Sequence, residues 1–96
     1  MKKYEFVFII KPDLTSLRIK KTLASLKKEI GKAGGKVEKD NDWGDKPLAY
    51  LIKNYQKGRY FLWELVFTKS PVFKNLNTFL SRQEDVIRHL MIKVKS

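Results

Sequence analysis

Residues 43–67 of the chain, WGDKPLAYLIKNYQKGRYFLWELVF, decide the fold. Two apolar and aromatic runs, Leu48–Ile52 and Tyr60–Phe67, stand on either side of a polar connector that ends in Lys57–Gly58. Two strand-like runs joined by a short polar connector with glycine are typical of a β-hairpin. The second run is apolar at nearly every position, which predicts a central strand that is covered on both faces.

Helical periodicity flanks this hairpin on both sides. Apolar residues recur every three or four positions from about Thr15 to Ala33. A second helical stretch follows Ser70–Pro71, where serine can cap a helix and proline fits its first position. Strand-like runs at Lys3–Ile10 and Val86–Lys95 lie outside the two helices. The hairpin is therefore the centre of a longer alternation of strands and helices.

The order of elements is strand, helix, strand, strand, helix, strand. It predicts one α+β domain over residues 1–96, a ferredoxin-like βαββαβ sandwich. Right-handed crossovers give a four-stranded antiparallel sheet of order 4-1-3-2, with both helices on one face. Pro47 has no amide proton for a strand ladder, so we expect the second strand, which starts near Lys36, to be an edge strand or to carry a bulge.

The chain is strongly basic. It has 21 Lys and Arg against 10 Asp and Glu, a net charge of +11 on 96 residues. Such an excess indicates a polyanionic partner, most often nucleic acid. A membrane surface is the competing polyanion. However, no basic helix has a continuous apolar face of Trp and Phe, and no apolar stretch approaches the ~20 residues needed to span a bilayer. The absence of cysteine fits a reducing compartment.

The sequence offers little for catalysis or metal binding. His89 is the only histidine, and there is no cysteine and no glycine-rich phosphate loop. A lone histidine lacks the partners of a triad or a metal site, so the simpler interpretation is a strand residue packed in the sheet. The functional interpretation is contact with RNA. The carboxylates around the second strand lack the glycine and the closing glutamate of a calcium loop. We expect no cofactor, no metal and no small-molecule substrate.

Basic residues on the first and last strands are the best candidates for RNA contact. The predicted order makes these strands neighbours, so Lys2 and Lys3 would lie near Arg88 and Lys93, with Tyr4 beside them. Basic side chains interleaved with aromatic rings suit RNA, because phosphates take the charge and exposed bases stack. We therefore predict one basic stripe at the edge of the sheet.

Two other functions use the same topology and stay open as alternatives. Residues 57–64, KGRYFLWE, partly match the main motif of RNA-recognition-motif domains, which bind single-stranded RNA without a protein partner. The match lacks the small residue between the first two aromatics, and Glu64 stands at the final aromatic position. A less favoured alternative is an acylphosphatase-like enzyme. It would need a phosphate-binding loop after the first strand, where Asp13 would repel an anion.

Four segments carry a resemblance to a known family: MKKYE at residues 1–5, GDKPLAYLIK at 44–53, GRYFLW at 58–63 and VIRHLMIK at 86–93. In their order and spacing they resemble the bacterial small-subunit ribosomal protein six family over nearly the whole chain. The Leu-Ala-Tyr-x-Ile block is the most specific of the four. Within it and just before it, Asp45, Pro47 and Leu51 depart from the usual pattern of the family.

The resemblance implies a structural constituent of the small ribosomal subunit in the bacterial cytoplasm, without enzymatic activity. It implies binding to the central domain of small-subunit ribosomal RNA, as a heterodimer with ribosomal protein eighteen. The RNA-binding residues that it implies are Lys2, Lys3, Tyr4, Lys46, Tyr50, Lys53, Arg88, His89 and Lys93. By alternation along the strands, the surface for the protein partner would comprise Val7, Ile9, Tyr60, Leu62, Val66, Leu90 and Ile92.

Overall fold

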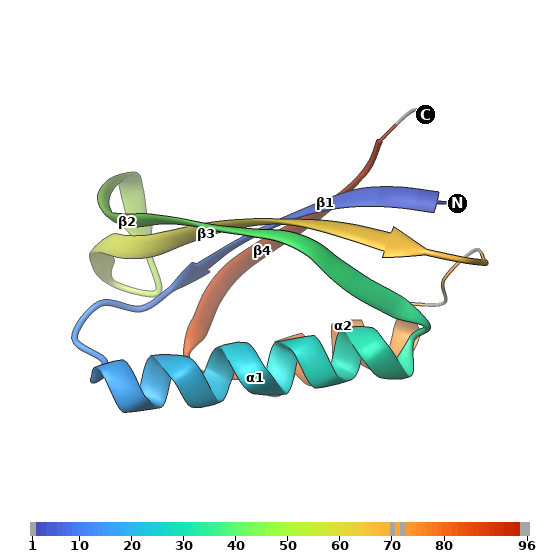
Figure 1. Cartoon of the computed structure of the whole chain (residues 1–96). Coiled ribbons are helices and arrows are strands. Elements are labelled where there is room, and N and C mark those ends of the chain that lie inside the picture. Colours follow the sequence, from blue (N-terminus) through green and yellow to red (C-terminus); the bar gives the residue numbers. More distant parts are fainter. Residues whose placement is uncertain (1, 70, 72, 95–96) are drawn as a thin grey trace.

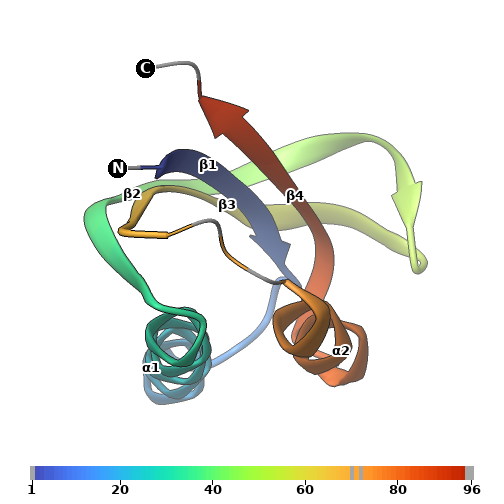
Figure 2. The same cartoon turned by 90° about the vertical axis from the view of Figure 1, so that its right-hand side faces the viewer.

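A computed structural model describes residues 2–69, 71 and 73–94 of the chain. Within them, four antiparallel strands form one sheet, and two helices cover one of its faces (Figure 1, Figure 2). The sheet order, β2-β3-β1-β4, is the predicted 4-1-3-2 order seen from the other edge, so the ferredoxin-like prediction is confirmed. The elements are β1 (Lys2–Ile10), α1 (Ser16–Lys32), β2 (Gly35–Ile52), β3 (Tyr55–Phe67), α2 (Lys74–Arg82) and β4 (Val86–Val94).

Aromatic side chains of the two central strands form the middle of the core. Phe6 on β1 pairs with Trp63 on β3, and Phe8 pairs with Phe61, in register. All four are at most 2% exposed. The Phe8 ring stacks on Phe61 with centroids 5.0 Å apart and meets the edge of Trp63 at 4.8 Å. Because side chains alternate along a strand, the residues between these aromatics project to the opposite side, which we call the outer face.

The first helix has the bounds that its periodicity predicts. Thr15 caps it, because its side-chain oxygen accepts a hydrogen bond from the Arg18 amide at 3.2 Å. Leu26 and Ile30, four positions apart, are fully buried against the sheet. After the helix, Gly34 adopts a φ of +87°, a conformation that glycine reaches without steric cost. The helix can therefore stop sharply and return the chain to the edge strand.

The second helix begins later than the sequence predicted. Pro71 lies before it in irregular backbone, and the residue at its N-cap is Phe73, which makes no side-chain cap hydrogen bond. The Phe73 ring packs edge-on against Tyr4 and Phe67, at centroid distances of 5.2 and 5.6 Å. Burial of this ring, rather than a local cap signal, sets where α2 starts. The predicted cap Ser70 and face residue Val72 lie outside the described residues, as does Lys95 at the predicted end of the last strand.

The turn of the hairpin also differs from the prediction. It consists of Lys53 and Asn54, with φ values of +50° and +70°, the conformation of a two-residue hairpin turn. Lys57 and Gly58 therefore lie within β3 rather than in the connector. Gly58 serves packing instead, because a Cβ at that position would lie 2.4 Å from Cγ2 of Ile9 on the neighbouring strand.

The edge strand β2 is irregular, as Pro47 indicated. Its pairing with β3 shifts register between Val37 and Lys39, between Asp42 and Gly44, and again after Pro47. Such bulges bend a strand and increase its twist. In Figure 1 the far end of the β2–β3 hairpin curls away from the helices, and in Figure 2 it extends past β4. The hairpin tip is thereby brought beside the start of the last strand.

Candidate nucleic-acid and protein interfaces

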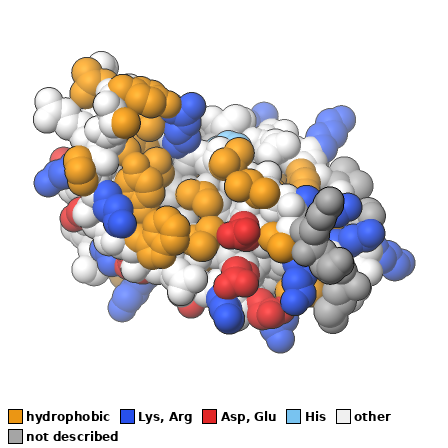
Figure 3. All heavy atoms as spheres, turned by 90° about the horizontal axis from the view of Figure 1, so that it is seen from above, with side chains coloured by type: hydrophobic (Ala, Val, Ile, Leu, Met, Phe, Trp, Pro, Cys, Tyr) orange, Lys and Arg blue, Asp and Glu red, His pale blue; other side chains and the backbone are white. Residues whose placement is uncertain are grey.

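The outer face is a grid in which each row takes one residue from each strand. The strand registers align Asn41, Leu62, Val7 and Leu90 in one row, and Gly44, Tyr60, Ile9 and Arg88 in the next. All seven residues predicted for the protein partner occupy this grid: Val7, Ile9, Tyr60, Leu62, Val66, Leu90 and Ile92. The apolar patch in Figure 3 extends over this face towards the hairpin.

Exposure differs along this apolar surface. Leu90 and Ile92, on the edge strand β4, are 56% and 45% exposed. Val7 and Leu62 on the central strands are half-buried. Ile9 is only 7% exposed, since Gly58 lets the neighbouring strand close over it. A partner would therefore meet chiefly the row of Val7, Leu62 and Leu90 together with Ile92.

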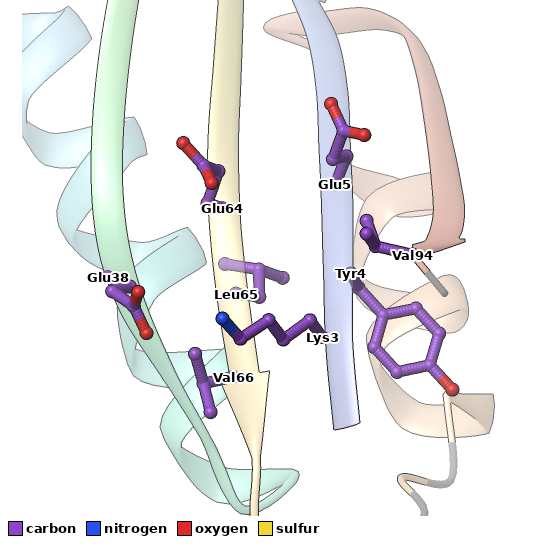
Figure 4. A pocket seen from close by; sticks show the side chains of 8 residues that line it. All are labelled: Lys3, Tyr4, Glu5, Glu38, Glu64, Leu65, Val66 and Val94. Atoms are coloured by element: carbon purple, nitrogen blue, oxygen red, sulfur yellow. The ribbon is translucent and has the colours of Figure 1, made fainter. Parts of the chain in front are cut away.

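The remaining two rows of the grid carry charge. Lys39, Glu64, Glu5 and Ile92 form one row, and Lys36, Val66, Lys3 and Val94 form the other. A pocket of about 230 Å³ opens there, and Lys3 and Glu38 are among its lining residues. Figure 4 shows the Lys3 side chain extending from β1 across β3, with Glu5 and Glu64 standing on adjacent strands. This end of the outer face mixes both signs of charge.

One group of predicted RNA-binding residues lies at the end of the sheet where both chain termini emerge. Lys93 on β4 pairs with Tyr4 on β1, and Lys2 and Lys3 precede Tyr4. Lys2, Lys3 and Lys93 are exposed. Tyr4 is only half-exposed, because its ring packs edge-on against Phe67 at 5.5 Å and joins the core from the helix side. Its ring is thus engaged in packing against the core.

A second group lies at the opposite end, where the hairpin tip meets β4. The Arg88 Nη1 donates a hydrogen bond to the Tyr50 hydroxyl at 2.5 Å, and the guanidinium lies 5.6 Å from the centroid of the Tyr50 ring. The pKa of His89 is below its ordinary value, first because surrounding side chains remove solvent from the imidazole and second because of the positive charge of Lys53. Tyr50, Lys53, Arg88 and His89 therefore form one cluster.

The predicted single basic stripe is consequently wrong as a geometric arrangement. Arg88 and Lys93 are five residues apart on an extended strand, which separates them by roughly 16 Å. They also project to opposite faces, because Arg88 pairs with Ile9 of the outer face and Lys93 pairs with Tyr4, whose ring joins the core from the helix side. Basic side chains gather at one end of Figure 3 and again beside the hairpin, with apolar and acidic side chains in between. The structure therefore has two basic ends rather than one stripe.

Lys46 lies on the edge strand β2, where it pairs with Gly58 beyond the row of Gly44 and Arg88. Its Nζ lies 5.5 Å from the centroid of the Trp43 ring, which is 49% exposed. Asp42 lies at the bulge of β2 between Asp42 and Gly44. Its carboxylate accepts a hydrogen bond from the Gly44 amide at 2.9 Å and forms an ion pair with Arg59. The hydrogen bond from Arg59 lowers the pKa of Asp42, although partial burial opposes it. Sequence reasoning did not single out Trp43 as a surface aromatic, although its place beside glycine on an edge strand was the available signal.

Sequence reasoning also missed Lys36 as a surface candidate. Lys36 lies in the same row as Lys3, with Val66 between them, so it adds a third strand to the basic end at the termini. Only the strand register brings these two lysines onto one face. Within the described residues, no group of three or more His, Cys, Asp or Glu could hold a metal ion. In the same part of the chain, neither helix is long and apolar enough to cross a membrane.

A family model described as ribosomal protein S6 matches residues 3–93. The chain belongs to the ribosomal protein S6 family. Three relatives, each called small ribosomal subunit protein bS6, are similar to nearly the whole of this chain. That of Aquifex aeolicus is 38% identical, with 99% of this chain and 86% of the relative covered. That of Campylobacter curvus is 36% identical (100% and 67% covered), and that of Onion yellows phytoplasma is 36% identical (99% and 99% covered).

The fold agrees with this S6 membership. The crystal structure of 30S ribosomal protein S6 from Thermotoga maritima superposes with a TM-score of 0.87 at 24% identity, covering 97% of this chain and 87% of that one. At that identity the likeness supports the shared fold. A structural role in the small ribosomal subunit follows from membership of the S6 family.

Proposed function

We propose that the chain binds the central domain of small-subunit ribosomal RNA as a heterodimer with ribosomal protein eighteen, in the bacterial cytoplasm and without enzymatic activity. The observation that carries the proposal is the division of the surface. Two basic ends, suited to phosphates, stand on either side of an apolar outer face, which suits a protein. One small domain can then contact both kinds of partner at the same time.

The RNA part of the proposal rests on exposed positive charge. Lys2, Lys3 and Lys93 at the termini, and Lys53 and Arg88 at the hairpin, are all exposed. Lysine and arginine that neutralise phosphates release condensed counterions, which drives binding at low salt. At the hairpin, the Tyr50 ring is 61% exposed and is oriented by its hydrogen bond to Arg88. A positioned aromatic ring beside a guanidinium is suited to an unpaired base.

The protein part rests on apolar exposure. Monomeric proteins seldom leave contiguous apolar patches uncovered, and such patches mark interaction sites. Leu90 and Ile92 are among the most exposed large apolar side chains of the described residues, and they continue the half-buried Val7 and Leu62. An apolar centre with a polar rim is the usual anatomy of a protein interface.

The same face argues against a stand-alone reader of the RNA-recognition-motif type. That type of domain stacks bases on aromatic side chains of its two central strands. Here Phe61 and Trp63 face the helices and are buried, and Tyr60 is the only aromatic on the described outer faces of β1 and β3. One half-buried ring gives a poor stacking platform.

Titration of a central-domain RNA transcript with this chain and purified ribosomal protein eighteen tests the proposal. We expect tight binding only when both proteins are present, and an affinity that falls steeply between 50 and 200 mM salt. Replacing Lys3 and Arg88 by alanine should weaken binding. The matched control, Lys20→Ala with Lys28→Ala on exposed positions of α1, removes the same charge and should have a much smaller effect. Equal losses in both pairs, or an affinity insensitive to salt, would contradict the proposal.

A further inference from the structure

Two glutamates stand directly opposite each other on the central strands. In the register of β1 and β3, Glu5 pairs with Glu64, and both project to the outer face. Both are half-buried. Like charges directly opposite on neighbouring strands destabilise a sheet. A chain with a net charge of +11 has thus placed two glutamates on adjacent central strands, on the face that its helices leave uncovered.

The surroundings compensate this pair only weakly. Among the described residues, the one cation within 4.0 Å of either carboxylate is the Lys39 Nζ, which lies 4.0 Å from Glu64. That ion pair is largely exposed, so it contributes little. The Lys3 side chain lies over β3 in Figure 4, yet it forms no ion pair with Glu5 or Glu64 in the same part of the chain. Glu5 is therefore left beside a second carboxylate without a cation in contact.

The apolar side of the pair is equally informative. On β4, Ile92 stands next to Glu5 and is 45% exposed. The adjoining row holds Leu62, Val7 and Leu90, which form the most apolar line of the outer face. The two carboxylates thus lie at the border of an apolar surface and would lose solvent when a partner covers it.

We propose that the Glu5–Glu64 pair receives an arginine or lysine side chain from the protein that docks on the outer face. This inference rests on the proposed function, since it specifies the chemistry of that partner: a basic segment whose cation is followed by apolar side chains. A guanidinium can donate to both carboxylates at once, which removes their repulsion as it forms charge-assisted hydrogen bonds. RNA is the less favoured occupant of the pair itself, because its phosphates would meet two carboxylates of the same sign.

The arrangement also provides specificity. A partner without a cation at the matching position would bury two unpaired negative charges. A partner with the cation contacts two carboxylates at once, so it gains more than the same contact would give with a single glutamate. The pair therefore selects for basic partners and against the backbone of RNA.

Calorimetric titration of ribosomal protein eighteen into three forms of the chain tests the inference. The forms are the wild type, a double variant Glu5→Gln with Glu64→Gln, and the control Glu29→Gln, which removes a carboxylate from the helix on the opposite side. We expect the double variant to bind about tenfold more weakly or worse, and the control to bind like the wild type. The urea midpoint of the free double variant should be equal to or above that of the wild type, because a repulsion has been removed.

Each outcome separates the possibilities. A double variant that binds ribosomal protein eighteen as well as Glu29→Gln does would overturn the inference, while tight wild-type binding would leave the proposed function standing. Tighter binding of the double variant to the central-domain RNA, with protein binding unchanged, would assign the outer face to RNA and overturn the inference as well. Absence of binding between ribosomal protein eighteen and the wild-type chain would overturn the proposed function itself, and the inference with it.

Discussion

The Nε–H of Arg18 donates a hydrogen bond to Oδ2 of Asp85 at 2.7 Å, which ties the first turn of α1 to the residue that precedes β4. Asp85 is 1% exposed, and the same oxygen accepts a hydrogen bond from the Thr22 hydroxyl at 3.0 Å. Its other carboxylate oxygen lies 3.6 Å from the Lys11 amine, in the loop after β1. One buried carboxylate thereby joins the end of the first strand, the first helix and the start of the last strand.

Replacing Asp85 by alanine should lower the free energy of unfolding by about 1–3 kcal/mol, since it removes the hydrogen bonds that Arg18 and Thr22 donate to a charged group, while the Thr22 hydroxyl keeps the Arg18 carbonyl as an acceptor at 3.1 Å. Arg18 is largely exposed and can turn to water, which keeps the loss below that of a fully buried pair. Urea denaturation measures the change. The neighbouring and exposed Glu84 is the control, and Glu84→Ala should change the free energy by no more than about 0.5 kcal/mol. Equal effects at the two sites would contradict this role of Asp85.

The same carboxylate should make stability depend on acid. Burial raises the pKa of Asp85, but the hydrogen bonds from Arg18 and Thr22 and the charges of Arg18 and Lys11 outweigh it, so its pKa in the fold is below the ordinary 3.8. The unfolded chain then takes up this proton first as the pH falls. The stabilisation is complete above about pH 4 and is lost as the pH falls through the folded pKa. Urea midpoints measured in this range should fall less steeply for Asp85→Asn than for the wild type, and parallel curves would exclude the carboxylate as the source.

The two glycines Gly58 and Gly31 should respond to alanine in opposite directions. A Cβ at Gly58 would lie 2.4 Å from Cγ2 of Ile9 and 3.2 Å from the carbonyl oxygen of Ile10, so Gly58→Ala should cost about 1–3 kcal/mol through overpacking. A Cβ at Gly31 meets nothing within 4 Å and lies in α1, where alanine is the better helix former. Gly31→Ala should therefore raise the free energy of unfolding by about 0.5 kcal/mol. Chemical denaturation of both variants gives the comparison, and a neutral Gly58→Ala would show that β3 can move away from β1.

Sequence predicts the parts of this fold that depend on periodicity. Phe6 and Phe8, like Phe61 and Trp63, are two positions apart in their strands, so alternation alone assigns all four to one face, and they form the core. The start of α2 and the place of Gly58 depend on tertiary contacts instead. Phe73 packs on Tyr4, and Gly58 lies against Ile9, and neither contact leaves a local sign in the chain.

The sequence predicts which residues lie on the candidate surfaces, but it does not predict which of them are neighbours there. Alternation placed the apolar outer face correctly, because it needs no information about register. The juxtaposition of Glu5 with Glu64 requires the register of two strands that are about sixty residues apart in the chain, and bulges such as that between Ile9 and Ile10 alter which residues face each other. The separation of Arg88 from Lys93 needs no register, because both lie on β4 and five residues of extended backbone keep them apart.

His89 should report whether RNA reaches the hairpin end. Its pKa lies below the ordinary 6.5 because of lost solvent and the charge of Lys53, so Lys53→Ala should raise it partway, with the desolvation remaining. A phosphate bound beside Lys53 and Arg88 would favour the charged imidazole and raise the pKa of His89 in the wild type as well. NMR titration of the imidazole protons, with and without the central-domain RNA, measures both shifts. In the free chain the lowered pKa also means that stability rises as the pH rises through the folded pKa towards the ordinary 6.5, and His89→Gln should flatten that rise. A pKa of His89 that stays constant when RNA binds would place the phosphates elsewhere and leave the basic end at the termini as the contact.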